Sequence, residues 1–337
     1  MKNKNTYIIA EIAQAHDGSL GMIHSYIDAL KSTGVDAIKF QFHSADNESS
    51  IHEKFRIPFS FQDKSRYEYW KRMEFTLEQW FGIKKHCDQM GIDFICSVFS
   101  NYSIDILEKI NNKIYKIPSG ELSNFLMLNK LSKLNKKTIL STGLSDFKEI
   151  GEAINILKKK TKEIMLLQCT TEYPTKPHDI GLENIDILKK KYNLRVGLSD
   201  HSGTIYPSLS AITLGADLIE VHATFDKRMF GPDTASSLTI SEIKTIVEGS
   251  KFINQSLSKI KNKNSITSSI KKNRNIFGRS IIANKKLREG HIITIDDIDS
   301  IKPSGYGLSP KQYLKIINKK LLKNKNKNDF LSLSDVI

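Results

Sequence analysis

Short apolar runs alternate with segments of helical spacing along most of the chain. The apolar runs of strand length lie at residues 7–13, 36–42, 93–99, 114–118, 138–141, 164–169, 195–198 and 217–222. Between them, apolar residues recur at every third or fourth position, which is the spacing of one helix face. Two such faces are Phe147, Ile150, Ile154 and Leu157, and Leu122, Leu126, Leu131 and Leu134. Strands that alternate with helices in this way predict parallel β–α–β units.

The number and spacing of these units favour a closed barrel. Eight strand–helix units within about 250 residues are the usual composition of a (β/α)8 barrel. An open, doubly wound sheet is the alternative, but such a sheet usually carries a glycine-rich phosphate loop after its first strand. The corresponding segment here, Ala13-Gln14-Ala15-His16-Asp17-Gly18, is not such a loop. We therefore predict an α/β fold in which residues 1–253 form a (β/α)8 TIM barrel.

The connection after the second predicted strand is unusually long. It covers residues 43–74 and is rich in aromatic side chains, namely Phe55, Phe59, Phe61, Tyr67, Tyr69 and Trp70. A loop of this length in a compact domain usually has a function or a structure of its own. We interpret it either as a lid or substrate-side wall, or as a packed excursion that covers the rim of the barrel.

The pattern changes after residue 253. Residues 254–275 are rich in serine, asparagine and lysine and have few apolar residues, which predicts a linker. Beyond it, residues 279–283 and 292–294 resemble short strands, residues 303–307 a tight turn and residues 310–317 a helix. We predict a small second domain at residues 276–337 that docks, because about 60 residues bury only a marginal core.

The composition constrains the class of protein and its compartment. With 39% hydrophobic and 26% charged residues, the 337-residue chain is globular in composition. No stretch approaches the roughly 18 apolar residues of a membrane span, and residues 1–6 lack the apolar core of a signal peptide. The three cysteines, Cys87, Cys96 and Cys169, form no Cys-x-x-Cys motif. We expect a cytoplasmic protein whose cysteines are buried and reduced.

The net charge of +14 belongs mainly to the C-terminal part. Residues 251–337 contain 19 of the 51 basic residues and 6 of the 37 acidic residues. Lysine alternates there with asparagine at residues 259–264 and 323–328, without interleaved aromatic residues. This pattern is typical of a solvated surface, and nucleic-acid binding is the weaker interpretation.

Two histidines lie at the ends of neighbouring predicted strands. His201 follows the seventh strand and His222 closes the eighth. The carboxyl ends of barrel strands form the face at which such enzymes do chemistry. Two imidazoles placed there can bind one divalent metal ion and leave positions open for water or substrate. The alternative is that each histidine is a hydrogen-bonded structural residue.

Two lysines interrupt otherwise apolar strands. Lys39 and Lys116 lie within the second and fourth predicted strands, and a lysine is almost never fully buried without a partner. They indicate either an anion at the mouth of the barrel or a structural carboxylate. Hydroxyl side chains at the other strand ends favour a bound phosphate, for which lysine is a point-charge ligand. A lysine that forms a Schiff base is the competing interpretation.

Six motifs in order along the chain resemble the sialic acid synthase family. They are Ile9-Ala10-Glu11-Ile12, Val35-Asp36-Ala37-Ile38-Lys39-Phe40-Gln41, Tyr115-Lys116-Ile117-Pro118-Ser119-Gly120-Glu121, Leu140-Ser141-Thr142-Gly143, Gly197-Leu198-Ser199-Asp200-His201 and Gly231-Pro232-Asp233. Residues 279–337 resemble the antifreeze-like (SAF, β-clip) domain of the same family. The resemblance implies a (β/α)8 barrel with this domain after it, a domain-swapped homodimer, and condensation of phosphoenolpyruvate with an N-acetylated hexosamine to a nonulosonic acid.

The resemblance also implies roles for single residues. Phosphoenolpyruvate would be held by Lys39, Ser97, Lys116, Ser119, Ser141 and Ser199. The divalent metal, with Mn²⁺ as first candidate and Mg²⁺, Co²⁺ or Zn²⁺ as alternatives, would be bound by His201 and His222. The sugar would be contacted by Gln41, Tyr173, Asp233 and Lys302. The carboxylate that stabilises charge at the reacting centre would be Glu121, with Glu11 as second candidate.

Some positions depart from the family pattern. Ala15-His16-Asp17-Gly18 stands where Asn-His-Asn-Gly is common, and Thr171 where an asparagine is common. Lys302-Pro303-Ser304-Gly305 stands where many members have Arg-Pro-Gly, whose arginine reaches the partner's sugar. A lysine cannot make the same bidentate contact. These departures leave the acceptor sugar open.

We therefore expect a metal-dependent transferase that makes a nonulosonic acid and releases phosphate. N-acetylmannosamine is the default acceptor, and the acceptors for legionaminic or pseudaminic acid are close alternatives. A phosphoenolpyruvate-condensing 3-deoxy-keto-acid synthase would need a second phosphate pocket, with further arginines at strand ends, which the predicted strands lack. The non-enzyme alternative is a carbohydrate-binding barrel.

Overall fold

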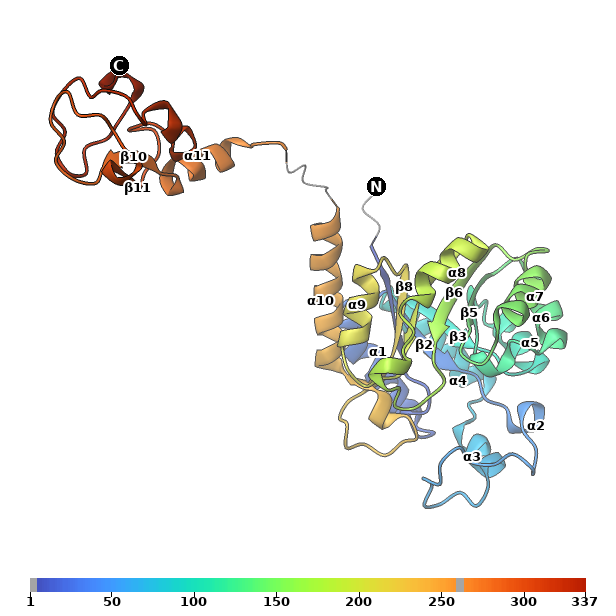
Figure 1. The fold of residues 1–337 in the computed structure, drawn as a ribbon. Coiled ribbons are helices and arrows are strands. Elements are labelled where there is room, and N and C mark those ends of the chain that lie inside the picture. Colours follow the sequence, from blue (N-terminus) through green and yellow to red (C-terminus); the bar gives the residue numbers. More distant parts are fainter. Residues whose placement is uncertain (1–4, 259–263) are drawn as a thin grey trace. The chain divides into compact units, whose positions relative to one another are not determined.

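The computed structural model describes residues 5–258 and 264–337, and the chain divides into two compact units at residues 1–259 and 260–337. In the first unit, eight parallel strands pair in chain order and β8 pairs with β1, so that the sheet closes into a barrel (Figure 1). The strands are β1 (Tyr7–Glu11), β2 (Ala37–Gln41), β3 (Asp93–Ser97), β4 (Ile114–Ile117), β5 (Lys137–Ser141), β6 (Glu163–Cys169), β7 (Arg195–Asp200) and β8 (Leu218–Thr224). The predicted (β/α)8 barrel is confirmed.

Helices follow the strands and form an outer layer. They are α1 (Leu20–Lys31), α4 (Leu77–Gln89), α5 (Asn101–Lys109), α6 (Phe125–Leu131), α7 (Phe147–Leu157), α8 (Asn184–Tyr192), α9 (Tyr206–Thr213) and α10 (Ile240–Leu257). The connections contain the short 3-10 helices η1 (Ser119–Glu121), η2 (Pro177–Asp179) and η3 (Thr234–Ser236) and the two-residue strand β9 (Leu238–Thr239). Capping boxes start α4, α5, α7 and α10, at Thr76, Ser100, Asp146 and Thr239.

The alternation of side chains explains why the strands read as apolar runs with polar ends. One large core lies between the strands and the helices. The barrel interior is filled by a second core of Ile9, Ala37, Ile95, Ile114, Ile139, Met165, Leu167 and Leu218. Glu11, Lys39 and Lys116 each lie two positions after a residue of this second core, on β1, β2 and β4. Because side chains alternate along a strand, they point to the same side of the sheet as that residue. Polar side chains therefore gather inside the barrel towards the carboxyl ends of its strands.

One predicted helix face is confirmed and the other is partly wrong. The face on α7 is buried apart from Phe147. On the other face, Leu126 is 78% exposed. The reason is that α6 is short and turns Met127 and Leu128 towards the core instead.

The connection between β2 and α4, which we call the β2–α4 excursion (residues 43–74), has a structure of its own. It contains α2 (Ala45–Glu48) and α3 (Arg66–Met73). Its small buried core consists of Ala45, Tyr69, Trp70 and Met73, with Phe55, Phe59 and Tyr67 packed against it. Arg72 ties the excursion to the connection after β1, because its guanidinium pairs with Asp63 and with Asp17 at 2.8 and 2.7 Å. The expectation of a packed excursion is confirmed.

The second unit has a separate core. In it, α11 (Ser268–Phe277) leads into β10 (Ser280–Ala283), which pairs antiparallel with β11 (Ile298–Ile301). The short helices are η4 (Ile295–Asp297), η5 (Pro310–Lys315) and η6 (Leu333–Asp335). The core consists of Ile281, Ala283, Leu287, Ile293, Leu308, Ile316, Leu321 and Leu331.

Several elements predicted after residue 253 differ from the structure. The predicted linker at 254–275 is helical at both ends, since α10 continues to Leu257 and Thr267 caps α11, while its residues 259–263 lie outside the described residues. The segment predicted as a strand at 292–294 is limited to one antiparallel bridge between Ile292 and Lys320. The Asp297 carboxylate accepts hydrogen bonds from the backbone and hydroxyl of Thr294 and so ends the pairing there. The strand that pairs with β10 is therefore β11. The helix predicted at 310–317 is the 3-10 helix η5.

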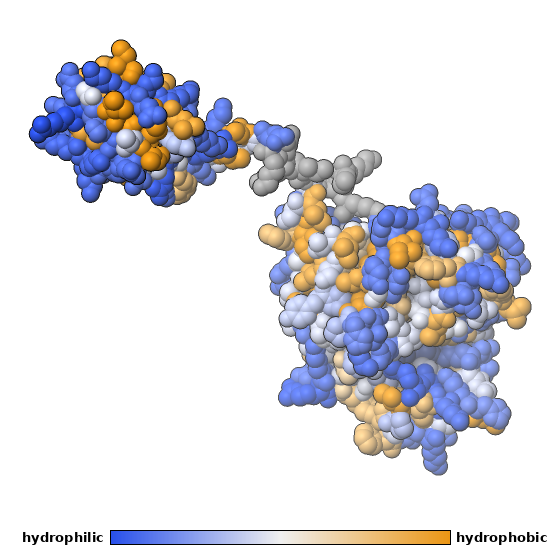
Figure 2. All heavy atoms as spheres, viewed as in Figure 1, coloured by the Kyte–Doolittle hydropathy of each residue, from blue (hydrophilic) through white to orange (hydrophobic). Residues whose placement is uncertain are grey.

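The face of the molecule drawn in Figure 2 is mostly hydrophilic, with scattered apolar residues. In the second unit, part of the positive charge is compensated by buried carboxylates, because Lys323 and Lys325 pair with Asp335 and Lys285 pairs with Asp297. Over residues 5–258 and 264–337, no helix is both long and apolar enough to cross a membrane.

Candidate active site

Four buried charged side chains meet inside the barrel, and we call them the charged cluster: Glu11, Lys39, Lys116 and Glu220. The Lys39 ammonium contacts the Glu11 carboxylate and lies 3.4 Å from Glu220 Oε1. Lys116 Nζ lies 2.9 Å from the same Glu220 oxygen, which also accepts a hydrogen bond from Ser199 at 3.0 Å. Because β4 and β8 stand four strands apart in a ring of eight, the Lys116–Glu220 pair bridges the barrel interior.

The charges of the cluster stabilise one another. Burial acts to raise the pKa of Glu220, but Lys116 and Lys39 outweigh it and lower that pKa to about 2. Burial acts to lower the pKa of Lys39, but Glu11 and Glu220 raise it. For Lys116, burial prevails over Glu220 and lowers the pKa. Lys116 is thus the cation with the least carboxylate compensation, and a further anion beside it would be stabilised.

The four serines predicted to bind phosphoenolpyruvate lie at or just after the carboxyl ends of barrel strands and are buried. They are Ser97, Ser119, Ser141 and Ser199. Ser97 accepts a hydrogen bond from Lys39 Nζ at 3.3 Å, and Ser119 accepts one from the backbone N–H of Gly143 at 3.1 Å. The Ser141 hydroxyl has no hydrogen-bond partner within the described part of the chain. Lys39, Lys116, Ser97 and Ser199 therefore belong to one connected network, and Ser141 offers a hydroxyl to a ligand.

The two predicted metal-binding histidines lie next to each other. Their ring centroids are 5.1 Å apart and both side chains are buried. Burial lowers the pKa of His201 to about 4, and burial together with His201 lowers the pKa of His222 well below its usual value. Both imidazoles are therefore neutral near pH 7, which is the form that binds a metal.

This pair of imidazoles fits a divalent ion that keeps open positions. His201 Nδ1 lies 3.2 Å from the carbonyl oxygen of Thr170, which leaves Nε2 for another partner. His222 Nδ1 lies 4.0 Å from Asp233 Oδ2. Among the described residues, no three His, Cys, Asp or Glu side chains are grouped so as to hold a metal. An ion at this place would have two protein nitrogens and take its other ligands from water or substrate.

A cavity of about 310 Å³ lies at the carboxyl ends of the strands, and we call it the rim pocket. It is lined by three residues predicted to contact a sugar, Gln41, Tyr173 and Asp233, and by His222. The β2–α4 excursion contributes a mainly apolar wall of Ile57, Phe59, Tyr69 and Trp70. The excursion is therefore also a wall of this pocket.

Arg56 of the excursion reaches across the rim pocket. Its Nη2 donates to Asp233 Oδ1 at 2.7 Å and to the carbonyl oxygen of Pro232 at 3.2 Å. Its guanidinium carbon lies 4.1 Å from the centre of the Tyr173 ring, whose centroid is 4.2 Å from that of His201. Sequence reasoning missed Arg56, because Asp233 is 177 positions further along the chain.

Two predicted residues stand apart from these contacts. Glu121 lies in η1, accepts a hydrogen bond from Asn124 at 2.8 Å, and has its pKa raised by burial. Lys302 lies in the second unit, with its ammonium 5.5 Å from the centre of the Phe277 ring. Glu220, by contrast, received no role from the sequence. The sequence could have indicated Glu220, because it is a charged residue inside an apolar strand, as Lys39 is.

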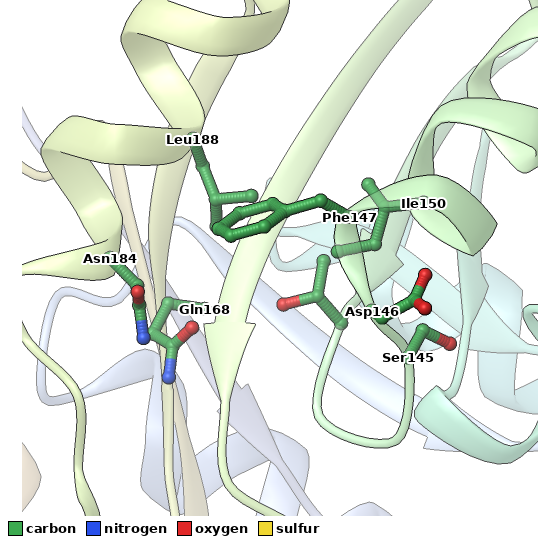
Figure 3. Close-up of a pocket in the computed structure, with 8 residues that line it drawn as sticks. Ser145, Asp146, Phe147, Ile150, Gln168, Asn184 and Leu188 are labelled. Carbon is green, nitrogen blue, oxygen red and sulfur yellow. The ribbon is translucent and has the colours of Figure 1, made fainter.

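A second cavity of about 310 Å³ lies outside the barrel, between α7 and α8 (Figure 3). The amides of Gln168 and Asn184 lie on one side of it, and Ser145 and Asp146 lie on the other, at the start of α7. The ring of Phe147 projects towards α8. No residue predicted for catalysis or binding lines this cavity, so the rim pocket and the charged cluster form the candidate active site.

Comparison with known proteins gives consistent matches over most of the chain. A sequence model of the NeuB family matches residues 26–262. The chain is 35% identical over 334 residues to N,N'-diacetyllegionaminic acid synthase of Campylobacter jejuni subsp. jejuni serotype O:2, covering 97% of this chain and 99% of the relative. It is 34% identical to pseudaminic acid synthase of Campylobacter jejuni subsp. jejuni serotype O:23/36, over 99% and 97% of the two chains. The crystal structure of N-acetylneuraminic acid synthetase from Leptospira borgpetersenii in complex with citrate is similar with a TM-score of 0.70 at 28% identity, over 80% of this chain and 90% of that one.

Proposed function

The chain belongs to the NeuB family, and from this premise we propose that it is a nonulosonic acid synthase, which joins phosphoenolpyruvate to an N-acetylated hexosamine and releases phosphate. The observation that carries the proposal is the charged cluster beside two neutral histidines. A site with buried cations on one side and two imidazoles on the other can bind one anionic substrate and one substrate with a carbonyl group.

Phosphoenolpyruvate is the substrate proposed for the cationic side. Lys39 and Lys116 would neutralise its phosphate and carboxylate, and Ser97, Ser119, Ser141 and Ser199 would complete the hydrogen bonds. Support comes from the unpartnered hydroxyl of Ser141 and from the incomplete compensation of Lys116. A Schiff-base role suits Lys116 less well, because its ammonium is paired with Glu220.

His201 and His222 are proposed to hold a divalent ion, with Mn²⁺ as first candidate and Mg²⁺, Co²⁺ and Zn²⁺ as alternatives. When bound, such an ion acts as a Lewis acid on the carbonyl oxygen of the acceptor. Tyr173 packs against the His201 ring at 4.2 Å between centroids and so fixes the orientation of that imidazole.

The remaining chemistry is proposed for side chains of this chain. Carbon 3 of the enol forms a bond to the acceptor aldehyde carbon, whose oxygen becomes a hydroxyl. Water then adds at carbon 2, where positive charge develops, and the bond from carbon 2 to the phosphate oxygen breaks to leave a keto group. A carboxylate near carbon 2 stabilises that charge. Glu121 and Glu11 both remain candidates, and the contact between Glu11 and Lys39 favours Glu11.

The acceptor is proposed to occupy the rim pocket, in contact with Gln41, Tyr173 and Asp233. N-acetylmannosamine is the default, and the acceptors for legionaminic and pseudaminic acid are the alternatives that the two Campylobacter relatives favour. The domain-swapped homodimer and the contact of Lys302 with the sugar stay predictions.

The test is phosphate release from phosphoenolpyruvate with a panel of N-acetylated hexosamines, each with and without Mn²⁺. We expect release with at least one sugar, and only when sugar and metal are both present. Absence of phosphate release across the panel, with Mn²⁺ bound to the protein, would refute the proposal and favour a carbohydrate-binding barrel.

A further inference from the structure

His43 is a buried residue of the rim pocket that the proposed reaction does not use. It follows β2 by two positions, and its ring is stacked between two aromatic rings. The centroid of Trp70 is 3.9 Å away with an interplanar angle of 18°, and that of Phe99 is 4.8 Å away with an angle of 22°. The ring plane is therefore fixed by packing, and only the two ring nitrogens can make directional contacts.

Both nitrogens of His43 have partners. Nδ1 lies 2.7 Å from Oε1 of Glu48, whose side chain in α2 is 7% exposed. Nε2 lies 3.1 Å from the amide nitrogen of Gln14 and 3.1 Å from the amide oxygen of Gln41. The imidazole thus joins a buried carboxylate at one end to two amides at the other.

These contacts determine which end of the Gln41 amide faces a ligand. The Gln41 oxygen accepts a hydrogen bond from the Gln14 amide at 2.5 Å and also faces His43. Because the Glu48 carboxylate accepts the proton on Nδ1, Nε2 of His43 accepts one N–H of the Gln14 amide. The other N–H of Gln14 donates to the Gln41 oxygen, so that His43 acts on Gln41 through Gln14. The nitrogen of the Gln41 amide makes no hydrogen bond to another residue in the described part of the chain, and Gln41 lines the rim pocket. Gln41 therefore offers two N–H donors to whatever occupies the pocket.

We propose that His43 and Glu48 are positioning residues that fix Gln41 with its amide N–H groups towards the acceptor, so that the pocket selects a sugar with a hydrogen-bond-accepting oxygen there, such as the carbonyl of an N-acyl group. This inference rests on the proposed function and adds the rule by which the site recognises its acceptor. Without His43 and Glu48, the Gln14 amide loses the partner that orients it. The amide of Gln41 can then rotate by half a turn and offer its oxygen, which repels an acceptor carbonyl.

The test compares steady-state kinetics of the full chain and the variant His43→Phe. Phenylalanine keeps a ring between Trp70 and Phe99 and removes only the nitrogens. We expect the KM for the acceptor to rise about tenfold, the size expected for loss of one well-oriented hydrogen bond, while kcat and the KM for phosphoenolpyruvate stay within about twofold. The matched control is His52→Phe, the same change at an exposed histidine of the same excursion, which should leave all three constants unchanged.

A double-mutant cycle with Gln41→Ala separates positioning from general packing. If His43 acts through Gln41, then His43→Phe should change the acceptor KM by less than about twofold in the Gln41→Ala background. If His43→Phe does not fold, Glu48→Gln replaces it, with an expected rise of about threefold. Equal acceptor KM values for His43→Phe and His52→Phe, or an undiminished effect without Gln41, would overturn the inference alone. A wild-type chain that is inactive with every acceptor would refute the proposed function itself.

Discussion

Replacing Lys116 by methionine separates the structural role of the charged cluster from its role in binding. The variant keeps most of the side-chain volume but leaves Glu220 with Lys39 as its remaining ion-pair partner, at 3.4 Å. At an effective dielectric constant of about 20, two unit charges 2.9 Å apart attract by about 6 kcal/mol. Removing one partner of a buried pair typically costs about 3–5 kcal/mol of folding free energy. We expect a loss of that size for Lys116→Met.

The assay is urea unfolding followed by tryptophan fluorescence, which reports on the first unit because Trp70 and Trp80 both lie in it. Adding Glu220→Gln to Lys116→Met removes the uncompensated carboxylate and leaves the Lys39–Glu11 pair. We expect the double variant to recover most of the stability but not the affinity for phosphoenolpyruvate. The matched control, Lys137→Met at a half-exposed ion pair at the start of β5, should cost less than about 1 kcal/mol. Recovery of phosphoenolpyruvate binding in the double variant would refute a direct role for Lys116.

Three further predictions concern the histidines, the rim pocket and the effect of pH. His222→Ala should abolish metal-dependent turnover and weaken Mn²⁺ binding in calorimetry while phosphoenolpyruvate still binds; unchanged Mn²⁺ affinity would contradict the metal assignment. Arg56→Met should raise the acceptor KM about tenfold at constant KM for phosphoenolpyruvate, since Asp233 and Tyr173 lose their contacts with the guanidinium, whereas Lys54→Met on the same excursion should have no effect. Burial raises the pKa of Asp200 from 3.8 to about 6, so the folded state holds a proton that the unfolded chain releases, and the contribution of Asp200 to stability falls as the pH rises between these values. In urea unfolding, the stability of wild type relative to Asp200→Asn should therefore fall as the pH rises from about 4 to about 6, and a difference that does not change with pH would contradict this.

The barrel could be predicted because the features that define it are carried by residues that are close together in the sequence. A strand buried on both faces must be apolar along its length, and the chemistry of a barrel lies at the carboxyl ends of its strands, so each strand and its polar end are adjacent in the sequence. Lys39 and Lys116 were conspicuous for the same reason, as charges inside apolar runs. The same argument applied to Glu220 would have predicted their shared partner.

The contacts of the rim pocket could not be predicted, because they join segments that are distant in the sequence. Arg56 meets Asp233 across 177 positions, and His43 meets Gln14 across 29 positions. In the second unit, the apolar pattern at 292–294 was correct about burial of Ile293 and about antiparallel pairing, which consists of one bridge between Ile292 and Lys320. It did not indicate how short the pairing is, since the side chain of Asp297 binds the backbone of Thr294. Side-chain hydrogen bonds of this kind leave no periodic signal.

The measurement that tests the central proposal most directly is the fate of oxygen during turnover in ¹⁸O-labelled water. Attack of water at carbon 2 breaks the carbon–oxygen bond of phosphoenolpyruvate. The released phosphate should therefore contain no ¹⁸O. Each phosphate should be matched by one product that consists of the acceptor plus one pyruvic acid and carries the ¹⁸O of water at carbon 2. Phosphate that carries ¹⁸O would mean that water attacks phosphorus, and phosphate that forms without this product would mean that no carbon–carbon bond is made. Either result would mean that the chain is not a nonulosonic acid synthase.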